Sequence, residues 1–207
     1  AETSLSAADD SEKRIIVSTD SPEIAAKAGE EGVEVPFLRP AELSTDTAGS
    51  REVILHAMDY ADSQGIAYDC VVLLQPTSPF RTGRHITEAL ALFNPETTDM
   101  VVSVCKASAN PYYNCFETDP ASGYLHISKG DGLLTRRQDA PEAWEYNGAV
   151  YVINPESIRK MPLGAFPRRI PYEMSREDSL DIDTPLDLTI ARAVMDARLK
   201  EATSQGN

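Results

Sequence analysis

The chain has 207 residues, of which 42% are hydrophobic and 25% are charged, and its formal net charge is -14. This length and composition suit one medium-sized domain with a real core. The negative charge argues against binding nucleic acid or an anionic membrane through the overall field, because the net potential repels polyanions. Any anionic ligand must therefore be bound by a local cluster of cations.

The sequence also indicates where the protein is located and which metal sites it is expected to lack. No stretch approaches the roughly 18 continuous apolar residues of a membrane span, and no signal peptide opens the chain, so we expect a cytoplasmic protein. The three cysteines form no C-x-x-C pair, and we expect Cys70, Cys105 and Cys115 to be reduced core residues. The three histidines lack ligand spacing, which argues against a histidine zinc site.

Strand and helix patterns alternate over the first hundred residues, which predicts an α/β fold with helices on the faces of a sheet. The first expected helix begins at Pro22, behind an N-cap at Ser21, and Gly32 closes it. The other expected elements are strands over residues 14–18, 33–37, 70–74 and 100–106 and helices over residues 51–64 and 85–93.

The pattern changes after residue 106. Between about residues 107 and 170, short runs separated by turn residues predict hairpins and loops, which we interpret as an inserted subdomain. Residues 151–153 are expected to return to the main sheet. The chain closes with a helix over residues 184–199, with Thr184 as N-cap, Pro185 in its first position and Asp187 in its first turn.

Ligands of open α/β sheets bind beyond the carboxyl ends of the strands, so the residues that follow strands are the first candidates. Residues 18–20 (Ser-Thr-Asp) follow the first expected strand, where a helix-capping turn is the alternative. After the third, Pro76 and Pro79 fix φ and make a rigid turn that holds the Gln75 amide in a defined direction. Such an amide presents a donor and an acceptor, as reading a nucleobase edge requires, whereas a plain strand-to-helix loop is the alternative.

Asp181 and Asp183 lie two residues apart in an extended segment, so both carboxylates are expected to project to the same side. Two oxygen donors with open remaining positions suit Mg²⁺, which keeps waters and takes phosphate oxygens as further ligands. Ordinary capping of the last helix is the alternative. Glycoside hydrolysis is a poorer rival, because its two acids face each other across a sugar.

A fourth candidate lies in the expected insertion. Lys129, Arg136, Arg137 and Gln138 bracket a glycine-rich turn in an otherwise acidic protein. Arginine binds carboxylate or phosphate through two parallel hydrogen bonds, so this is a candidate anion site. A solvated charged loop is the alternative.

Five stretches occur in a fixed order, namely "IIVSTDSPEIA", "VPFLRPAELSTDTAGS", "LLQPTSPFRT", "GDGLLTRRQDAPEAWEYNGAVYVIN" and "SLDIDTPLDL". This order resembles the acylneuraminate cytidylyltransferases, also called CMP-sialic acid synthetases. The likeness runs from about Ile15 to Leu188, and LLQPTSP and DIDTPLDL are its most diagnostic motifs.

The resemblance implies a Rossmann-like three-layer α/β/α nucleotide-diphospho-sugar transferase fold with a mostly parallel sheet. Residues 1–207 would be one cytidylyltransferase domain, with an inserted, hairpin-rich dimerisation and sugar-binding subdomain at about residues 107–170. The implied enzyme joins CTP to a sialic acid, giving CMP-sialic acid and pyrophosphate. Mg²⁺ would be the cofactor and a homodimer the assembly.

The resemblance also implies roles for individual residues. The metal ligands would be Asp181 and Asp183. The nucleotide side would hold Arg39, Ser50, Gln75, Pro76, Thr77 and Ser78, with the last four at the cytosine and ribose. The sugar side would hold Lys129, Arg136, Arg137, Gln138, Tyr146 and Asn147, with Arg137 and Gln138 toward the sugar's carboxylate and N-acyl group.

Two departures from the family pattern affect what we expect of the chain. The family opens with a strand and a phosphate-binding loop of the form I-P-A-R-G-G-S-K, and roughly 35 residues of this kind are absent here. The domain is therefore expected to be N-terminally incomplete, either as a piece of a longer chain or as an inactive protein. In addition, Glu145 stands where some relatives place a basic residue near the sugar.

Two other functions remain open at this point. One is a non-catalytic module that binds a nucleotide sugar or mediates dimerisation. The other is the same reaction with another 2-keto acid sugar, such as legionaminate, pseudaminate or deoxyoctulosonate, because loop side chains set the acceptor.

Overall fold

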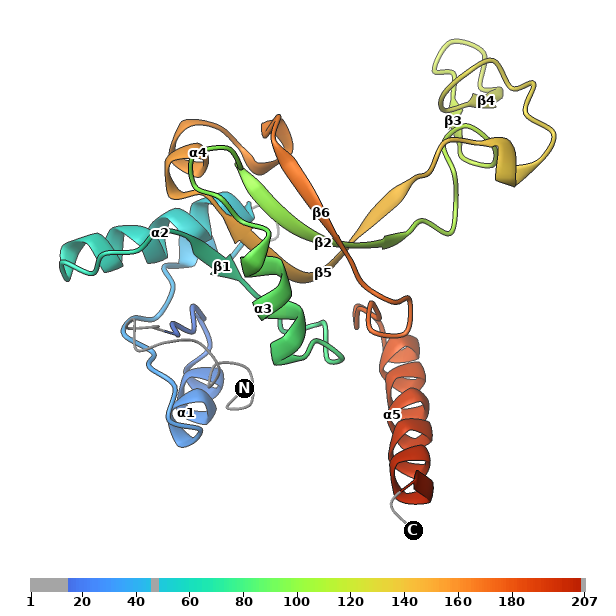
Figure 1. Cartoon of the computed structure of the whole chain (residues 1–207). Coiled ribbons are helices and arrows are strands. Elements are labelled where there is room, and N and C mark those ends of the chain that lie inside the picture. Colours follow the sequence, from blue (N-terminus) through green and yellow to red (C-terminus); the bar gives the residue numbers. More distant parts are fainter. Residues whose placement is uncertain (1–14, 46–48, 206–207) are drawn as a thin grey trace. The chain divides into compact units, whose positions relative to one another are not determined.

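The computed structural model describes residues 15–45 and 49–205 (Figure 1). The chain divides into two compact units, and each is described by itself. Of the described residues, the first unit holds 15–45, 49–73, 82–101 and 151–170. The second holds 74–81, 102–150 and 171–205.

Four strands form one sheet in the order β1-β5-β2-β6. They are β1 (Val71–Leu73), β5 (Trp144–Ile153), β2 (Met100–Lys106) and β6 (Arg169–Glu173). Strands β1 and β5 are antiparallel, with Val71 opposite Ile153. Strand β5 also runs antiparallel to β2, because Asn154 donates to the Asp99 carbonyl near one end and Ala107 to the Ala143 carbonyl near the other.

The edge strand β6 runs in the same direction as β2. The Asp99 N–H donates to the Arg168 carbonyl at 2.9 Å, and the Met174 N–H donates to the Val104 carbonyl at 2.8 Å. Strands β1, β2 and β6 therefore share one direction and β5 opposes them, so the prediction of a mostly parallel sheet is confirmed. Pro171, in the middle of β6, is tolerated because an edge strand has one unpaired side.

The helices of the first unit begin and end at local signals. Helix α1 (Pro22–Glu30) has Ser21 as its N-cap, whose side chain accepts from the Ile24 N–H at 3.3 Å. Helix α2 (Ser50–Ser63) stops just before Gly65, which has φ +68. Helix α3 (Gly83–Ala91) begins two residues earlier than expected, because the His85 Nδ1 accepts from the Thr82 N–H and caps the first turn.

Two expected strands shorten to single bridges. Ile16 pairs with Glu34 and Thr19 with Leu38, both in parallel fashion, and the described parts of residues 14–18 and 33–37 form no continuous strand. Arg14, the first residue of that expected strand, lies outside the described residues. A strand needs a ladder of partners, and two bridges satisfy few of the backbone groups.

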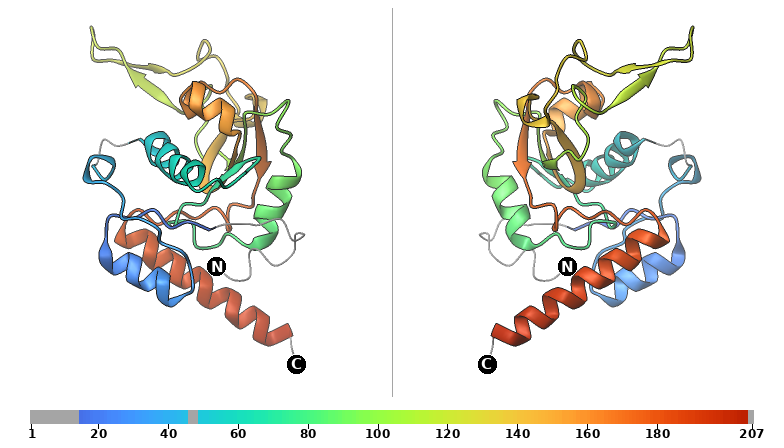
Figure 2. Two further views of the ribbon diagram at one scale, coloured as in Figure 1. Left: turned by 90° about the vertical axis from the view of Figure 1, so that its left-hand side faces the viewer. Right: turned by 90° about the vertical axis from the view of Figure 1, so that its right-hand side faces the viewer.

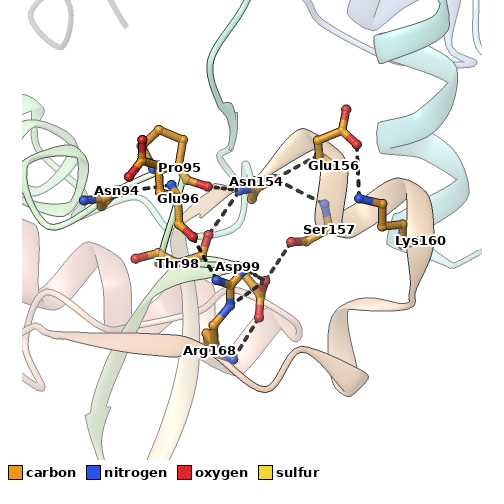
Figure 3. Close-up of polar contacts among 10 residues, drawn as sticks. All are labelled: Asn94, Pro95, Glu96, Thr98, Asp99, Asn154, Glu156, Ser157, Lys160 and Arg168. Carbon is orange, nitrogen blue, oxygen red and sulfur yellow. Dashed lines mark hydrogen bonds and ion pairs between the residues drawn. The ribbon is translucent and has the colours of Figure 1, made fainter.

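A buried carboxylate, that of Asp99, joins several segments of the first unit through polar contacts (Figure 3). Asp99 accepts from the Ser157 hydroxyl at 2.7 Å and from the Arg168 guanidinium and backbone N–H. Asn154, also buried, caps helix α4 (Pro155–Lys160) and donates to the carbonyls of Pro95 and Thr98. Arg51 of α2 donates to the Ile158 carbonyl at 2.9 Å, which joins α2 to α4.

The second unit carries the hairpin and the last helix. Strands β3 (Phe116–Thr118) and β4 (Leu125–Ile127) form a separate antiparallel pair, which stands apart from the other strands of this unit (Figures 1 and 2). Helix α5 (Pro185–Gln205) begins at the expected proline and runs six residues past the expected end. The short 3-10 helix η3 (Arg137–Asp139) belongs to this unit, whereas η2 (Ala41–Leu43) and η4 (Leu163–Ala165) belong to the first.

Two further expectations concern the burial of the cysteines and the presence of membrane-spanning helices. Cys105 is buried, whereas Cys70 and Cys115 are half-buried, and all three are free. The core placement is thus confirmed for Cys105 alone. Within residues 15–45 and 49–205, none of the helices combines the length and the apolar character needed to cross a membrane.

Candidate nucleotide and metal site

Residues 75–80, called the elbow here, leave β1 in a tight turn fixed by two separate contacts. The Arg81 guanidinium donates to the carbonyls of Gln75 and Ala149, both at 2.9 Å. Burial lowers the pKa of the Arg81 guanidinium from its usual value. The Ser78 side chain, 2% exposed, donates to the Asn147 carbonyl at 3.2 Å. The elbow is thus fastened to β5 on both sides, as a rigid ligand-binding turn requires.

The Gln75 amide lies against a glycine of β5. Gly148 has φ +72, and a Cβ there would meet the Gln75 amide oxygen and come within 3.3 Å of the Ser78 Oγ. Only glycine accommodates both this backbone conformation and this approach without strain. Sequence analysis did not identify Gly148 or Arg81, although an arginine directly after the elbow and a glycine inside a strand pattern were available signals.

Residues 175–184, called the acidic loop here, lie next to the elbow. The Ile182 N–H donates to the Thr77 carbonyl at 3.0 Å. Ile182 separates Asp181 from Asp183, so this hydrogen bond places the backbone of both predicted metal ligands beside the predicted nucleotide-binding turn. The structure therefore brings together two segments that are far apart in the chain.

The two carboxylates differ in their surroundings. The Asp181 Oδ1 is buried and receives no hydrogen bond from the described residues. Asp183 is exposed. A buried carboxylate oxygen without a donor is costly unless a cation or water contacts it, and Mg²⁺ prefers such oxygens. Among the described residues no group of three or more metal-binding side chains occurs, so any cation here would take its remaining ligands from water and substrate.

The capping function predicted as the alternative for these acids belongs to a third aspartate. Asp187 accepts from the Thr184 hydroxyl and N–H, both at 2.7 Å, and from the Asp183 N–H at 3.2 Å. These hydrogen bonds, that of the Thr184 hydroxyl first, lower the pKa of Asp187 from its usual value of 3.8. Asp187 therefore caps α5, which leaves the carboxylates of Asp181 and Asp183 available.

Asn147 lies at the centre of the second unit and is 4% exposed. Its amide nitrogen donates to the Ser179 hydroxyl at 2.8 Å, and its amide oxygen accepts from the Ser103 hydroxyl at 2.6 Å and the Ala149 N–H at 3.2 Å. The amide's hydrogen-bonding capacity is thus used within the protein. Its role as a sugar ligand stays a prediction.

The predicted sugar-side cations already have partners inside the second unit. Arg136 binds Asp139 through two hydrogen bonds, at 2.7 and 2.9 Å. Arg137 donates to the carbonyls of Ala107 and Ser108. Lys129 lies over the Tyr112 ring at 5.8 Å. The remaining sugar-side residues are Gln138, which is exposed, and Tyr146, which is 48% exposed.

Glu145, the departure from the family pattern, has a basic neighbour. Its carboxylate lies 3.7 Å from the Arg176 guanidinium and accepts from the Cys105 thiol at 3.4 Å. Burial, followed by this hydrogen bond, raises the pKa of the Cys105 thiol from its usual value of 9.0. Arg176 thus places a positive charge beside the Glu145 carboxylate.

Two predicted nucleotide-side residues belong to the first unit. Arg39 forms an ion pair with Asp20 at 3.1 Å and donates to the Ser44 hydroxyl at 3.0 Å. The candidate segment 18–20 is therefore bound to Arg39. Ser50 is the exposed first residue of α2.

Comparison with known proteins gives three informative likenesses. An N-acylneuraminate cytidylyltransferase of Streptococcus agalactiae serotype V is 36% identical over 173 residues, which is 83% of this chain and 40% of that protein. The chain thus spans about two fifths of that relative's length. A CMP-N,N'-diacetyllegionaminic acid synthase of Legionella pneumophila is 30% identical over 185 residues, 89% of this chain and 78% of that protein. No family model matches.

The third likeness concerns the fold. A solved structure of CMP:2-keto-3-deoxy-manno-octonic acid synthetase complexed with CTP superposes with a TM-score of 0.60 at 14% identity. The superposition covers 90% of this chain and 82% of that one. The predicted fold, that of the nucleotide-sugar transferases, is confirmed.

Proposed function

Because the chain belongs to the acylneuraminate cytidylyltransferase family, we propose that it transfers the cytidylyl group of CTP to a sialic acid. The anomeric hydroxyl of the sugar attacks the α-phosphorus in line, and pyrophosphate leaves. The observation that carries this proposal is the 3.0 Å hydrogen bond from Ile182 to Thr77. This hydrogen bond joins the motif DIDTPLDL, which contains both acids, to the turn of the motif LLQPTSP.

We assign the nucleotide to the elbow and the metal to the acidic loop. The rigid turn at residues 76–78 presents the Gln75 amide to the cytosine. Arg39 and Ser50 stay predicted nucleotide-side residues. Asp181 and Asp183 would hold Mg²⁺. The Asp181 Oδ1 supports this choice, because it is buried and accepts no hydrogen bond from the described residues. When bound, the cation would neutralise charge on the phosphates.

The sugar side of the site is assigned to the segment around the hairpin. Arg137 and Gln138 would contact the carboxylate and N-acyl group, with Lys129, Arg136, Tyr146 and Asn147 nearby. Glu145 and Arg176 form an ion pair on the same unit and would adjust the local charge. We also propose a homodimer in which this hairpin-rich region contacts the second subunit.

A second acceptor is favoured by one comparison. The Legionella synthase, named for N,N'-diacetyllegionaminic acid, matches 78% of its length. A legionaminate is a 2-keto acid sugar with the same anomeric chemistry, so the same residues could activate it. The choice between the two acceptors depends on side chains around the sugar rather than on the elbow or the acidic loop.

Pyrophosphate release tests the reaction. Protein of complete natural sequence is incubated with CTP, MgCl₂ and, in parallel, N-acetylneuraminate, N,N'-diacetyllegionaminate, pseudaminate or deoxyoctulosonate. We expect release with at least one acceptor and loss of release in Asp181→Asn, which removes the charge of the buried oxygen without changing side-chain volume. Silence with all four sugars would overturn the proposed activity.

A further inference from the structure

Two residues, Asn147 and Arg198, each contact both the elbow and the acidic loop. The first is Asn147, whose backbone carbonyl accepts from Ser78 of the elbow while its side-chain amide nitrogen donates to Ser179 of the acidic loop. The amide oxygen accepts from Ser103 of β2, so the Asn147 side chain cannot turn without breaking its hydrogen bonds to Ser103 and Ser179. It fixes the two segments from the interior of the second unit.

The second is Arg198 of helix α5. Its Nη2 donates to the Asp178 carboxylate of the acidic loop at 2.9 Å. Its guanidinium carbon lies 4.6 Å from the centre of the Phe80 ring, within the usual range of a cation-π contact. Phe80 is the last residue of the elbow and is 4% exposed. Arg198 therefore joins the same two segments from the side of α5.

The residues that Asn147 and Arg198 contact lie close together in the sequence. Asp178 and Ser179 come just before the predicted metal ligands, and Ser78 and Phe80 lie at the end of the elbow. Within the acidic loop, Ser175 Oγ accepts from the Asp178 N–H, and the Ser179 hydroxyl donates to the Ser175 carbonyl at 2.6 Å. The loop is thus internally braced, so fixing Asp178 and Ser179 also fixes where Asp181 lies relative to Thr77.

We propose that Arg198 and Asn147 are positioning residues that hold the Asp181 carboxylate at the distance from the elbow at which one metal-bound nucleotide contacts both. The inference rests on the proposed function for its metal and nucleotide. In this role both residues act through Asp178, Ser179, Ser78 and Phe80, and not through direct contact with the metal or the nucleotide. Outer partners of metal-binding side chains commonly change metal affinity by about 10 to 100-fold when removed, because they set the orientation of the carboxylate.

The test uses substitutions that remove one link at a time. Arg198→Gln removes the charge and the planar stacking group, and Ser179→Ala removes the hydroxyl that accepts from Asn147 and donates to the Ser175 carbonyl. Arg192→Gln is the matched control, because Arg192 is an exposed arginine on the same helix. Should Arg198→Gln fail to fold, Asp178→Asn breaks the same link from the loop side.

Two readouts separate positioning from general stability. The first is the dissociation constant of Mn²⁺ in the presence of CTP, measured by electron paramagnetic resonance. We expect it to rise about tenfold in Arg198→Gln and Ser179→Ala and to stay within about twofold in Arg192→Gln. The second is hydrogen exchange of the Ile182 amide, which should become faster in both variants while amides of β2 keep their protection.

Unchanged Mn²⁺ affinity together with unchanged Ile182 exchange in folded variants would overturn the inference. A fall in β2 protection equal to that of Ile182 would also do so, because it would show a loss of overall stability. Failure of the proposed function is seen separately, as silence of the unsubstituted protein in the pyrophosphate assay. Ile182 exchange does not depend on turnover and reports on the two links in either case.

Discussion

At the scale of single residues, Asp99 combines burial with four hydrogen bonds to its carboxylate. Donation from the Arg168 guanidinium is the main cause that lowers its pKa from 3.8 to about 2, with further contributions from the Ser157 hydroxyl and the Arg168 N–H. The folded pKa is below the unfolded one, so this carboxylate adds stability above about pH 4. The contribution disappears as the pH falls through about 2.

Asp99→Asn should therefore lower the free energy of unfolding at pH 7 by about 2 kcal/mol, because the shift corresponds to this much differential interaction. The difference between variant and parent should shrink as the pH falls from 4 to 2. Urea unfolding at a series of pH values measures it. The control is Asp69→Asn, an exposed aspartate of the same unit; a constant deficit across this range would contradict the assignment.

The two acids of the acidic loop give a second prediction at this scale. Asp183→Asn should lower turnover at least about tenfold and raise the Mg²⁺ concentration needed for half-maximal rate, because a neutral amide is a poorer ligand for a hard cation. Steady-state rates against Mg²⁺ concentration measure both. Asp196→Asn, at an exposed position on α5, is the control. Unaltered turnover and Mg²⁺ dependence would remove Asp183 from the site.

The Gln75 amide gives a third prediction. Gln75→Ala should weaken CTP binding and reduce the preference for CTP over UTP, because the amide would no longer read the cytosine edge. The elbow should keep its conformation, since Arg81 holds it through the Gln75 carbonyl rather than the side chain. The ratio of kcat/KM for the two nucleotides measures the effect, with Gln64→Ala as the exposed control. An unchanged ratio would mean that another group reads the base.

At the scale of elements, helix α5 starts with a reciprocal cap that keeps the acidic loop and the helix distinct. Thr184 donates to Asp187 from both its hydroxyl and its N–H, and the Asp187 N–H donates weakly to the Thr184 hydroxyl at 3.3 Å. The sequence T-P-L-D carries this cap within four residues, which is why the helix start was predictable. The helix end was not, because no glycine or proline stops it before residue 205.

Thr184→Ala should raise the pKa of Asp187 toward its usual value, because the hydroxyl is the largest contributor to lowering it. A carboxylate NMR titration of Asp187 measures this change. Thr184→Ser keeps the hydroxyl and should leave the titration near that of the parent. A pKa that does not move in Thr184→Ala would show that the backbone N–H groups alone form the cap.

Other elements show where local patterns were insufficient. Strand β5 begins at Trp144, seven residues before the expected return to the sheet. The sequence W-E-Y-N-G resembles a loop, but this polar first half of the strand pairs with β2. Strand β6 contains Pro171, which reads as a break in a strand, yet its place at the sheet edge permits it. Helices α1 and α2 and strand β2 appear where predicted, because their caps and apolar runs are local.

At the scale of the whole molecule, the β3–β4 hairpin has an uncovered apolar face. The register pairs Phe116 with Ile127 and Thr118 with Leu125, so Phe116 and Leu125 share one face. They are 56% and 67% exposed. A two-stranded hairpin is marginally stable alone in water, so cover from a second subunit would stabilise it.

We therefore predict that the protein sediments at twice the mass of one chain and that the double variant Phe116→Ser, Leu125→Ser dissociates to monomers. Loss of apolar area from the interface is the reason. Analytical ultracentrifugation measures the change. His126→Ser, on the opposite face of the hairpin, is the control and should remain dimeric. A parent protein that is monomeric at all concentrations would remove the proposed dimer.

The sequence alone determined the features that depend on neighbouring residues: the helix starts at Ser21 and Thr184, the rigid turn between two prolines, and the pair of acids before the last helix. These arise from capping, fixed φ and side-chain spacing, which act over a few residues. Only the tertiary structure decided that Ile182 bonds to Thr77, that Asn147 bonds to both Ser78 and Ser179, and that Arg198 reaches both Asp178 and Phe80. Such contacts join segments distant in the chain, and their formation depends on packing that no local pattern encodes.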